Sequence, residues 1–312
     1  MIEIDEVTKR YGPTVAVDRL SFEVREGEVT GFLGPNGAGK STTMRMMIGL
    51  DSPTSGRVTI DGRRYGDLKF PLRHVGALLE ARAVHPGRSA RNHLRWLADS
   101  NGIDRRRVDE VLEIVGLSDV ADRRTGGFSL GMGQRLGIAT ALLGDPATLL
   151  LDEPVNGLDP EGIQWIRELL RTLAAEGRSV LVSSHLMTEM AMTADRLIVV
   201  GQGRLIAQGT VDEVVRSSSI GYVQVATADP QTLRRLLVDA GASVDTQPDG
   251  ALIVTGIHAR DIGIMAGSAG IALHELSPRN ASLEEAFMEL TRNASEYRAG
   301  GEHAVTHQGA AA

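Results

Sequence analysis

Hydrophobic and polar residues follow two different periods along the first two thirds of the chain. Stretches in which apolar and polar side chains alternate, and short apolar runs, predict β-strands. These stretches cover residues 1–7, 14–24, 27–33, 56–62, 75–79, 148–153, 179–185 and 196–209, the last as two strands about a glycine turn. Because helical segments are interspersed with the apolar strands, the pattern predicts a mainly parallel sheet.

Apolar residues recur at helical spacing in the segments between these strands. The pattern is helical over residues 40–50 and over most of residues 89–143. Residues 159–177 predict a strongly amphipathic helix, which Asp159 is placed to cap and Pro160 to start. We therefore expect several helices in residues 89–143, between the strand at 75–79 and the strand at 148–153.

A Ser-rich segment, residues 215–221, predicts a linker between two domains. After it, strand, helix, strand, strand, helix and strand are predicted in residues 221–226, 230–240, 243–246, 251–255, 258–266 and 271–275. This βαββαβ order suggests a small ferredoxin-like α+β module. A last helix begins at a capping box of Ser282 and Glu285. The expected domains are residues 1–216 and 217–298, followed by a disordered tail, 299–312.

Composition narrows the class of protein. The 312 residues are 42% hydrophobic and 23% charged, with a formal net charge of −7, which argues against a general nucleic-acid binder. The chain has no cysteine, which excludes disulfides, thiolate metal sites and cysteine nucleophiles. We find neither a secretory leader nor a run of 18 apolar residues, so we expect a cytosolic chain unless a partner holds it at a membrane.

The segment GPNGAGKST, residues 34–42, matches the phosphate-binding pattern G-x-x-x-x-G-K-[ST]. It follows a predicted strand and precedes a predicted helix, where backbone N–H groups and the helix N-terminus surround phosphate oxygens. Lys40 is expected to reach the β- and γ-phosphates, and Ser41 to offer a hydroxyl to Mg²⁺. An ordinary glycine-rich turn is the alternative. The predicted nucleotide-binding residues are Gly34, Pro35, Asn36, Gly37, Ala38, Gly39, Lys40, Ser41 and Thr42.

Acids and a histidine follow three of the other predicted strands. Asp152 is expected at the end of a strand neighbouring the phosphate loop, where it would suit Mg²⁺, and Glu153 would polarise an attacking water. Alternatively, this pair is a strand end of surface acids. His185 ends another predicted strand of the same sheet, which favours a contact with the γ-phosphate over a structural or solvated role. Glu80 is either a solvated strand end or part of the site, because open α/β sheets bind ligands at strand ends.

Residues 128–160, FSLGMGQRLGIATALLGDPATLLLDEPVNGLDP, strongly resemble the ABC transporter ATPase family. In that family a signature sequence opens a helix before the acidic strand, and an aspartate-containing loop follows the strand. The resemblance covers residues 1 to about 216. It implies an α/β P-loop NTPase domain of the ABC ATPase type, with a mixed sheet and a helical subdomain at about residues 81–144.

The resemblance also implies roles for individual residues. Tyr11 matches an aromatic side chain that stacks on adenine, and a turn aromatic is the alternative. Ser129 and Gly131 match the signature that contacts the γ-phosphate of ATP held by the opposite subunit. Asp159 matches the loop that crosses the dimer interface, a role compatible with capping a helix. His185 matches the switch histidine.

Three positions depart from the common family pattern. Leu130 stands where the first glycine of the signature usually is, and Met132 where a glutamine is, which leaves fewer polar contacts to ATP. Glu80 stands at the position of a glutamine that contacts Mg²⁺ and the attacking water. A carboxylate can bind Mg²⁺ but, when ionised, cannot donate a hydrogen bond. The variant signature, and more weakly residues 282–291, resemble exporters of the bacitracin- and daunorubicin-resistance kind.

These resemblances imply an ATP- and Mg²⁺-dependent ATPase that acts as a homodimer. It would power export of a drug- or antibiotic-like molecule through separate polytopic membrane permease subunits, which would hold it at the cytoplasmic face of the cell membrane. The alternative is a soluble ABC ATPase that acts on nucleic acid or the ribosome. Only residues 43–128 separate the phosphate loop from the signature segment, and they show no sustained heptad pattern. The sequence also holds a single phosphate loop. We therefore expect no nucleic-acid partner.

The C-terminal module leaves two readings open. It is either a ligand-sensing or regulatory domain, or an element that supports interaction or dimerisation. Its predicted strands hold no obvious polar cluster, which favours the second reading.

Overall fold

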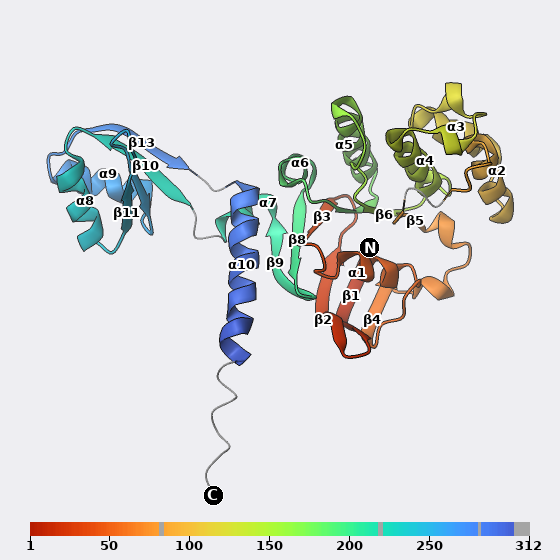
Figure 1. Cartoon of the computed structure of the whole chain (residues 1–312), viewed down its shortest axis with the longest axis horizontal. Coiled ribbons are helices and arrows are strands. Elements are labelled where there is room, and N and C mark those ends of the chain that lie inside the picture. Colours follow the sequence, from red (N-terminus) through yellow and green to blue (C-terminus); the bar gives the residue numbers. More distant parts are fainter. Residues whose placement is uncertain (81–83, 218–220, 280–281, 303–312) are drawn as a thin grey trace, which may run out of the picture. The chain divides into compact units, whose positions relative to one another are not determined.

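The computed structural model describes residues 1–80, 84–217, 221–279 and 282–302. The chain divides into two compact units, the first formed by Met1–Gly209 and the second beginning at Thr210. Most of the first unit is drawn in red to green in Figure 1, and most of the second in blue. Each unit has its own sheets and its own buried apolar cluster, so we describe them separately.

The first unit contains a three-stranded antiparallel sheet in the order β2-β1-β4. Its strands are β1 (Ile2–Tyr11), β2 (Thr14–Val24) and β4 (Ser55–Ile60). The predicted alternation is visible in β1, where Ile2 and Ile4 are buried and the acidic side chains beside them are exposed. One face of this sheet therefore contributes to the core and the other is solvated.

A six-stranded sheet forms the centre of the first unit, in the order β5-β6-β7-β3-β8-β9. Its strands are β3 (Val29–Leu33), β5 (Val75–Leu78), β6 (Thr148–Asp152), β7 (Ser179–Ser183), β8 (Arg196–Gly201) and β9 (Arg204–Thr210). The strands from β5 to β8 in this order pair in parallel, which confirms the prediction of a mainly parallel sheet.

Helix α1 (Lys40–Met47) joins the two sheets into one core. Its buried Met44, Met46 and Met47 belong to the same apolar cluster as residues of both sheets, among them Ile2 and Phe32. The N-terminus of α1 directly follows β3, and this connection fixes the phosphate loop between a buried strand and a buried helix.

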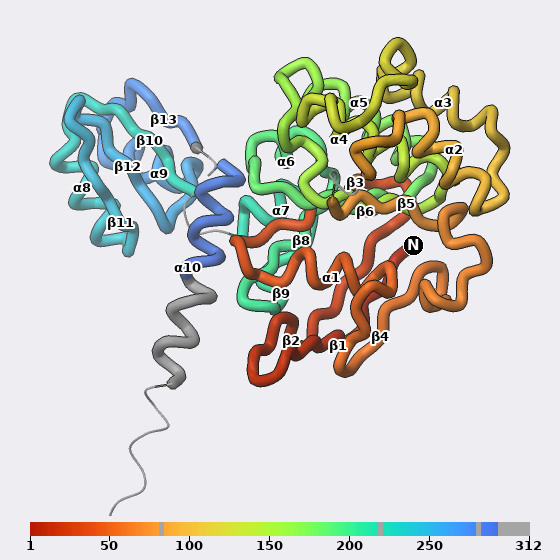
Figure 2. Tube along the Cα trace, turned by 45° about the vertical axis from the view of Figure 1, so that its right-hand side comes forward, coloured from red at the N-terminus to blue at the C-terminus, as the bar shows by residue number. Residues whose placement is uncertain are grey.

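The helical segment predicted at 89–143 contains α2 (Ala90–Ser100), α3 (Arg106–Ile114) and α4 (Leu130–Leu142). Figures 1 and 2 show these three helices grouped together, away from β1, β2 and β4. Short 3₁₀ turns lie at Tyr65–Asp67, Pro71–Arg73, Ser118–Val120 and Thr125–Gly127. Residues 81–83, where the predicted subdomain begins, lie outside the described residues.

Two further helices complete the first unit. In α5 (Pro160–Ala175) the Asp159 side chain accepts a hydrogen bond from the Gly162 amide at 2.9 Å, so the predicted cap is present. Helix α6 (Met187–Thr193) was not predicted from the sequence. Its seven residues make less than two turns, too few for a helical period to be recognised.

The second unit contains a four-stranded antiparallel sheet in the order β11-β12-β10-β13. Its elements are β10 (Tyr222–Thr227), α8 (Pro230–Asp239), β11 (Ser243–Thr246), β12 (Leu252–Thr255), α9 (Ala259–Ser268) and β13 (Leu273–Arg279). This is the predicted βαββαβ order, and "ferredoxin-like" is our interpretation of it. Side chains of both helices and of the sheet form one buried cluster.

The domain boundary and the tail differ from the expectation. Helix α7 (Val211–Arg216) occupies the start of the expected linker and lies beside α10 (Leu283–Glu302), so the second unit begins before α7 rather than after it. The Ser282–Glu285 capping box is confirmed. Because α10 extends to Glu302, the predicted tail is helical at its start, and its remainder, 303–312, lies outside the described residues, as do 218–220 of the linker.

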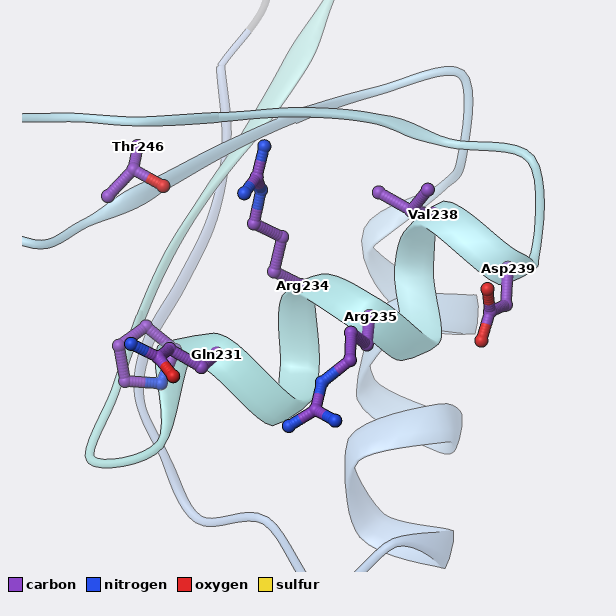
Figure 3. Close-up of a pocket in the computed structure, with 7 residues that line it drawn as sticks. Gln231, Arg234, Arg235, Val238, Asp239 and Thr246 are labelled. Carbon is purple, nitrogen blue, oxygen red and sulfur yellow. The ribbon is translucent and has the colours of Figure 1, made fainter.

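A pocket of about 630 Å³ lies beside α8 in the second unit. Figure 3 shows that Arg234 and Arg235 leave this helix in different directions, with Arg234 extending to the side on which Thr246 of β11 lies. Because the two guanidinium groups diverge, they do not form a single forked site for one anion. None of the predicted site residues lines this pocket.

Candidate functional site

The carboxyl ends of four adjacent strands bring most of the predicted site residues to one edge of the six-stranded sheet. The phosphate loop follows β3, His185 follows β7, and Asp152 and Glu153 lie at the end of β6. Glu80 follows β5 at the same edge. Strand β7 lies between β3 and β6, so the acids are two strands away from the phosphate-loop strand, not on the adjacent one.

The phosphate loop turns on glycines that adopt positive φ angles. Gly37 has φ 80° and Gly39 has φ 99°, in the region that disfavours other residues. A Cβ on Gly39 would come within 2.6 Å of the Ala16 carbonyl oxygen, so glycine is required there for space as well. These two glycines allow the chain to turn sharply from β3 into α1.

Lys40 folds back over this loop. Its Nζ donates to the carbonyl oxygen of Gly34 at 2.6 Å, and to that of Pro35 at 3.4 Å. Burial lowers the pKa of Lys40, and the nearby carboxylates of Glu153 and Asp152 oppose that shift. The ammonium group is therefore held among oxygen atoms at the centre of the loop.

A series of hydrogen bonds connects α1 to the ends of β6 and β7. Ser41 Oγ donates to Asp152 Oδ2 at 2.8 Å, and the hydroxyl of Ser183 donates to the other oxygen of the same carboxylate. The Glu153 amide donates to Ser183 Oγ at 2.9 Å. The Glu153 carboxylate and His185 Nδ1 lie 2.7 Å apart. One continuous polar line therefore runs from the phosphate-loop helix to His185.

Ser183 was not singled out from the sequence. It is the last residue of β7 and is fully buried, yet its hydroxyl contacts both acid-bearing residues. The available signal was a hydroxyl residue closing an apolar strand that ends next to the site. Serine at a strand end is common, so this signal alone would not identify it.

Tyr11 lies near the phosphate-loop helix, at the end of β1. Its hydroxyl donates to Asp51 Oδ2 at 3.1 Å, and Lys9 Nζ lies 4.9 Å from the centre of its ring. Desolvation and the Asp51 carboxylate raise the pKa of the Tyr11 phenol, while a hydrogen bond with Thr42 lowers it. The ring is 47% exposed, so it offers an aromatic surface close to the predicted nucleotide site.

Ser129, Gly131 and Asp159 lie at the N-termini of two helices. Ser129 caps α4 by accepting a hydrogen bond from the Met132 amide at 3.2 Å, as Asp159 caps α5. Within the described ranges, none of the three forms a hydrogen bond with the phosphate loop.

Glu80 is exposed, and within the described part of the chain its side chain makes no hydrogen bond or ion pair. Its place at the carboxyl end of β5, beside β6, is the position that the sequence predicted. The three residues that follow it, 81–83, lie outside the described residues.

Comparison with known proteins supports this geometry. The family profile described as ABC transporter matches residues 17–156, and a domain of unknown function matches residues 221–284. An uncharacterized ABC transporter ATP-binding protein of Bacillus subtilis, YhcH, is 43% identical over 72% of this chain and 75% of its own length. The bacitracin transport ATP-binding protein BcrA of Bacillus licheniformis is 42% identical over 69% and 71%.

Among solved structures, a dimeric post-hydrolysis state of the ATP-binding cassette MJ0796 bound to ADP and Pi resembles the first unit. Its TM-score is 0.63 at 27% identity, over 67% of this chain and 98% of that chain. The residues that the profile matches include the phosphate loop, the signature segment and both acids at the end of β6. The chain therefore belongs to the ATP-binding proteins of ABC transporters, and its first unit is an ABC ATPase that binds and hydrolyses ATP.

Proposed function

We propose that this chain is the ATP-hydrolysing subunit of an exporter and drives a drug- or antibiotic-like small molecule through separate polytopic membrane subunits. ATP hydrolysis is supported above all by the series of hydrogen bonds beside the phosphate loop that connects Ser41 to His185. Export of an antibiotic-like compound is supported by the relative named for bacitracin transport.

The phosphate loop binds the nucleotide, and Lys40 pairs with its β- and γ-phosphates. These phosphate contacts replace the hydrogen bonds of Lys40 to the loop carbonyls. The buried ammonium group is therefore paired with oxygen atoms both before and after the nucleotide binds. The exposed ring of Tyr11 stacks on the adenine. Backbone N–H groups of residues 34–42 complete the phosphate contacts.

Glu153 is the group that polarises the attacking water. Its carboxylate already contacts His185, which holds it at the carboxyl edge of the sheet, and Lys40 lies close enough for electrostatic attraction. His185 is 58% exposed at its side chain, so its ring can contact the γ-phosphate as well as Glu153. Together the two residues orient the water for in-line attack.

Mg²⁺ fits the oxygen atoms that this edge of the sheet presents. Ser41 Oγ and Asp152 Oδ2, which lie 2.8 Å apart, are hard oxygen ligands from two different elements. Glu80, which follows β5, would add a third oxygen. When bound with the nucleotide, Mg²⁺ would neutralise charge on its phosphates.

Two copies of the chain, arranged head to tail, complete each ATP site. Ser129 and Gly131 of one copy face the γ-phosphate bound by the other, and Asp159 lies in the loop between them. The N-terminus of α4 favours an anion at that position. The dimeric cassette with bound ADP and Pi supports this arrangement.

The membrane subunits are separate chains in this proposal. Among the described helices, none has the length and the hydropathy needed to cross a membrane. We place the dimer at the cytoplasmic face of the membrane, where its partners would hold it. The name of the bacitracin transport relative supports this location.

Replacement of Glu153 by glutamine tests the catalytic assignment. Glu153→Gln should bind ATP with unchanged affinity but lose at least about 99% of its ATPase rate, because an amide is a far weaker base than a carboxylate. Steady-state ATPase assays and equilibrium binding of ATP measure the two effects. Glu168→Gln, an exposed glutamate on α5, is the matched control and should keep both.

Hydrolysis by Glu153→Gln at the wild-type rate would show that Glu153 is not the base. Transport is tested separately by purification of the tagged chain from membranes that contain its permease. Recovery of a polytopic partner, with ATP-dependent efflux from vesicles, would support the exporter. A chain that remains wholly soluble in such cells, and binds RNA or ribosomes, would favour the soluble alternative.

A further inference from the structure

The backbone of Glu153 has a conformation that needs support from its surroundings. Its φ angle is 51°, in the left-handed region that residues with a Cβ rarely adopt. The next residue is Pro154, which further restricts the backbone of the residue before it. Such a conformation persists at a functional site only where neighbouring groups hold it.

Two buried side chains hold the backbone groups of Glu153. Its amide donates to Ser183 Oγ at 2.9 Å, and its carbonyl oxygen accepts from Gln134 Nε2 at 3.1 Å. Gln134 is only 4% exposed and Ser183 is fully buried. Hydrogen bonds in such surroundings are costly to break, because water cannot replace the lost partner. The peptide groups before and after Glu153 are therefore both fixed.

Gln134 lies on α4, on the same helix face as Leu130 one turn earlier. That face fits closely against the segment after β6. A Cβ on Gly157 would come within 2.3 Å of the Leu130 side chain, and a Cβ on Gly131 within 2.9 Å of the Gly157 carbonyl oxygen. The helix that Ser129 caps thus contacts the segment after β6 at Gly157 and at Glu153.

We propose that Gln134 is a positioning residue for Glu153, which it holds from α4 through a hydrogen bond to the carbonyl oxygen. This inference rests on the proposed role of Glu153 in hydrolysis. The bond keeps the left-handed backbone from relaxing, and so it keeps the Glu153 carboxylate directed at His185. It also makes the position of Glu153 depend on the helix that would contact ATP bound by the other subunit.

The contacts of the phosphate loop do not pass through Gln134. Lys40 bonds to the loop carbonyls and Ser41 to Asp152, whereas the side chain of Gln134 donates to the backbone carbonyl of Glu153. Loss of this bond should therefore change the rate of hydrolysis and leave nucleotide affinity unchanged. A purely structural role for Gln134 would lower the amount of folded protein and would not separate these two quantities.

The test is Gln134→Met, which keeps the length of the side chain and removes the donor. We expect kcat to fall roughly ten- to hundredfold, the usual effect of a displaced catalytic group, while KM for ATP is unchanged. Rates are expressed per ATP-binding site, determined by nucleotide titration, so that unfolded protein does not count. In a Glu153→Gln background, Gln134→Met should lower the residual rate no further, because Gln134 acts through Glu153.

Arg135→Met is the matched control. Arg135 lies next along α4, and its Nη1 also donates to a carbonyl oxygen, that of Val115 at 2.9 Å, away from Glu153. We expect this variant to have a lower Tm and a kcat close to that of the wild type. Equal losses of kcat in the two variants would mean that α4 packing alone is responsible, and would overturn the proposal.

A wild-type kcat in Gln134→Met, or a raised KM with kcat unchanged, would also overturn it. Failure of the underlying function gives a different result. If Glu153→Gln hydrolyses ATP normally, the role of Glu153 is wrong. If Glu153→Gln is inactive and Gln134→Met is normal, only the positioning role of Gln134 is wrong.

Discussion

At the residue scale, the hydroxyl of Ser183 links the two acids at the end of β6. It donates its single proton to Asp152 and accepts the amide proton of Glu153, so one small side chain orients both residues. Complete burial excludes water that could replace either bond. Polar side chains of α1, α4, β7 and the segment after β7 contact the residues at the end of β6: Ser41, Gln134, Ser183 and His185.

Glu80 is tested by two substitutions at the end of β5. Glu80→Gln should keep ATPase activity, because the amide oxygen can still contact Mg²⁺. Glu80→Ala should lower it roughly tenfold, or uncouple it from transport, if this side chain orients Mg²⁺ and water. ATPase rates at several Mg²⁺ concentrations, and efflux in vesicles with the permease, measure these effects. Fully coupled transport by the Ala variant would return Glu80 to the role of an exposed surface acid.

At the element scale, sequence patterns predicted where strands and helices lie along the chain better than they predicted which strands are adjacent in the sheet. The strand at β6 and the phosphate loop were both recognisable, because apolar runs and fixed glycines are local features. The position of β7 between β3 and β6 was not, because strand order depends on how distant segments cross over one another. Helix α7 was missed for another reason: its six residues are too few for periodicity, although Thr210 and Glu213 form a capping box.

The site divides in the same way. The loop glycines, Lys40 and the two acids could be predicted, because their spacing repeats a pattern with a known mechanism. Gln134 and Ser183 could not, because their roles arise from burial beside Glu153, which no local pattern encodes. The sequence marked Leu130 as a departure from the family signature, but its close approach to Gly157 could not be predicted from a local pattern.

The cap of α5 gives a prediction for one element. Asp159→Ala removes the acceptor for the Gly162 amide and should cost about 1 kcal/mol of stability, the usual value for an N-cap. Asp159→Asn keeps the cap and should preserve most of it. The shift in Tm of the two variants, measured on the full chain, separates capping from charge. Equal destabilisation by Ala and Asn would show that the carboxylate charge matters more than the hydrogen bond.

At the scale of the whole molecule, every predicted site residue belongs to the first unit, Met1–Gly209. The second unit has its own sheet and its own buried apolar cluster, and the site hydrogen bonds described above join residues of the first unit. We infer that the two units have different functions. The first binds and hydrolyses ATP, and the second supports dimerisation or interaction with another protein.

Truncation after β9 tests this division. A chain ending at Thr210 keeps all strands of the six-stranded sheet and should bind ATP with the affinity of the full chain, because the contacts of Lys40, Ser41 and Tyr11 lie before it. Its ATPase rate should show a steeper dependence on protein concentration if the second unit supports the dimer, since mass action then controls assembly. Titration calorimetry measures binding, and sedimentation measures dimer formation with the full-length chain as control. If the truncated chain binds ATP normally and its ATPase rate depends on protein concentration as that of the full chain does, the second unit has a role other than dimer support. Loss of ATP binding in a folded truncated chain would contradict the assignment of ATP binding to the first unit alone.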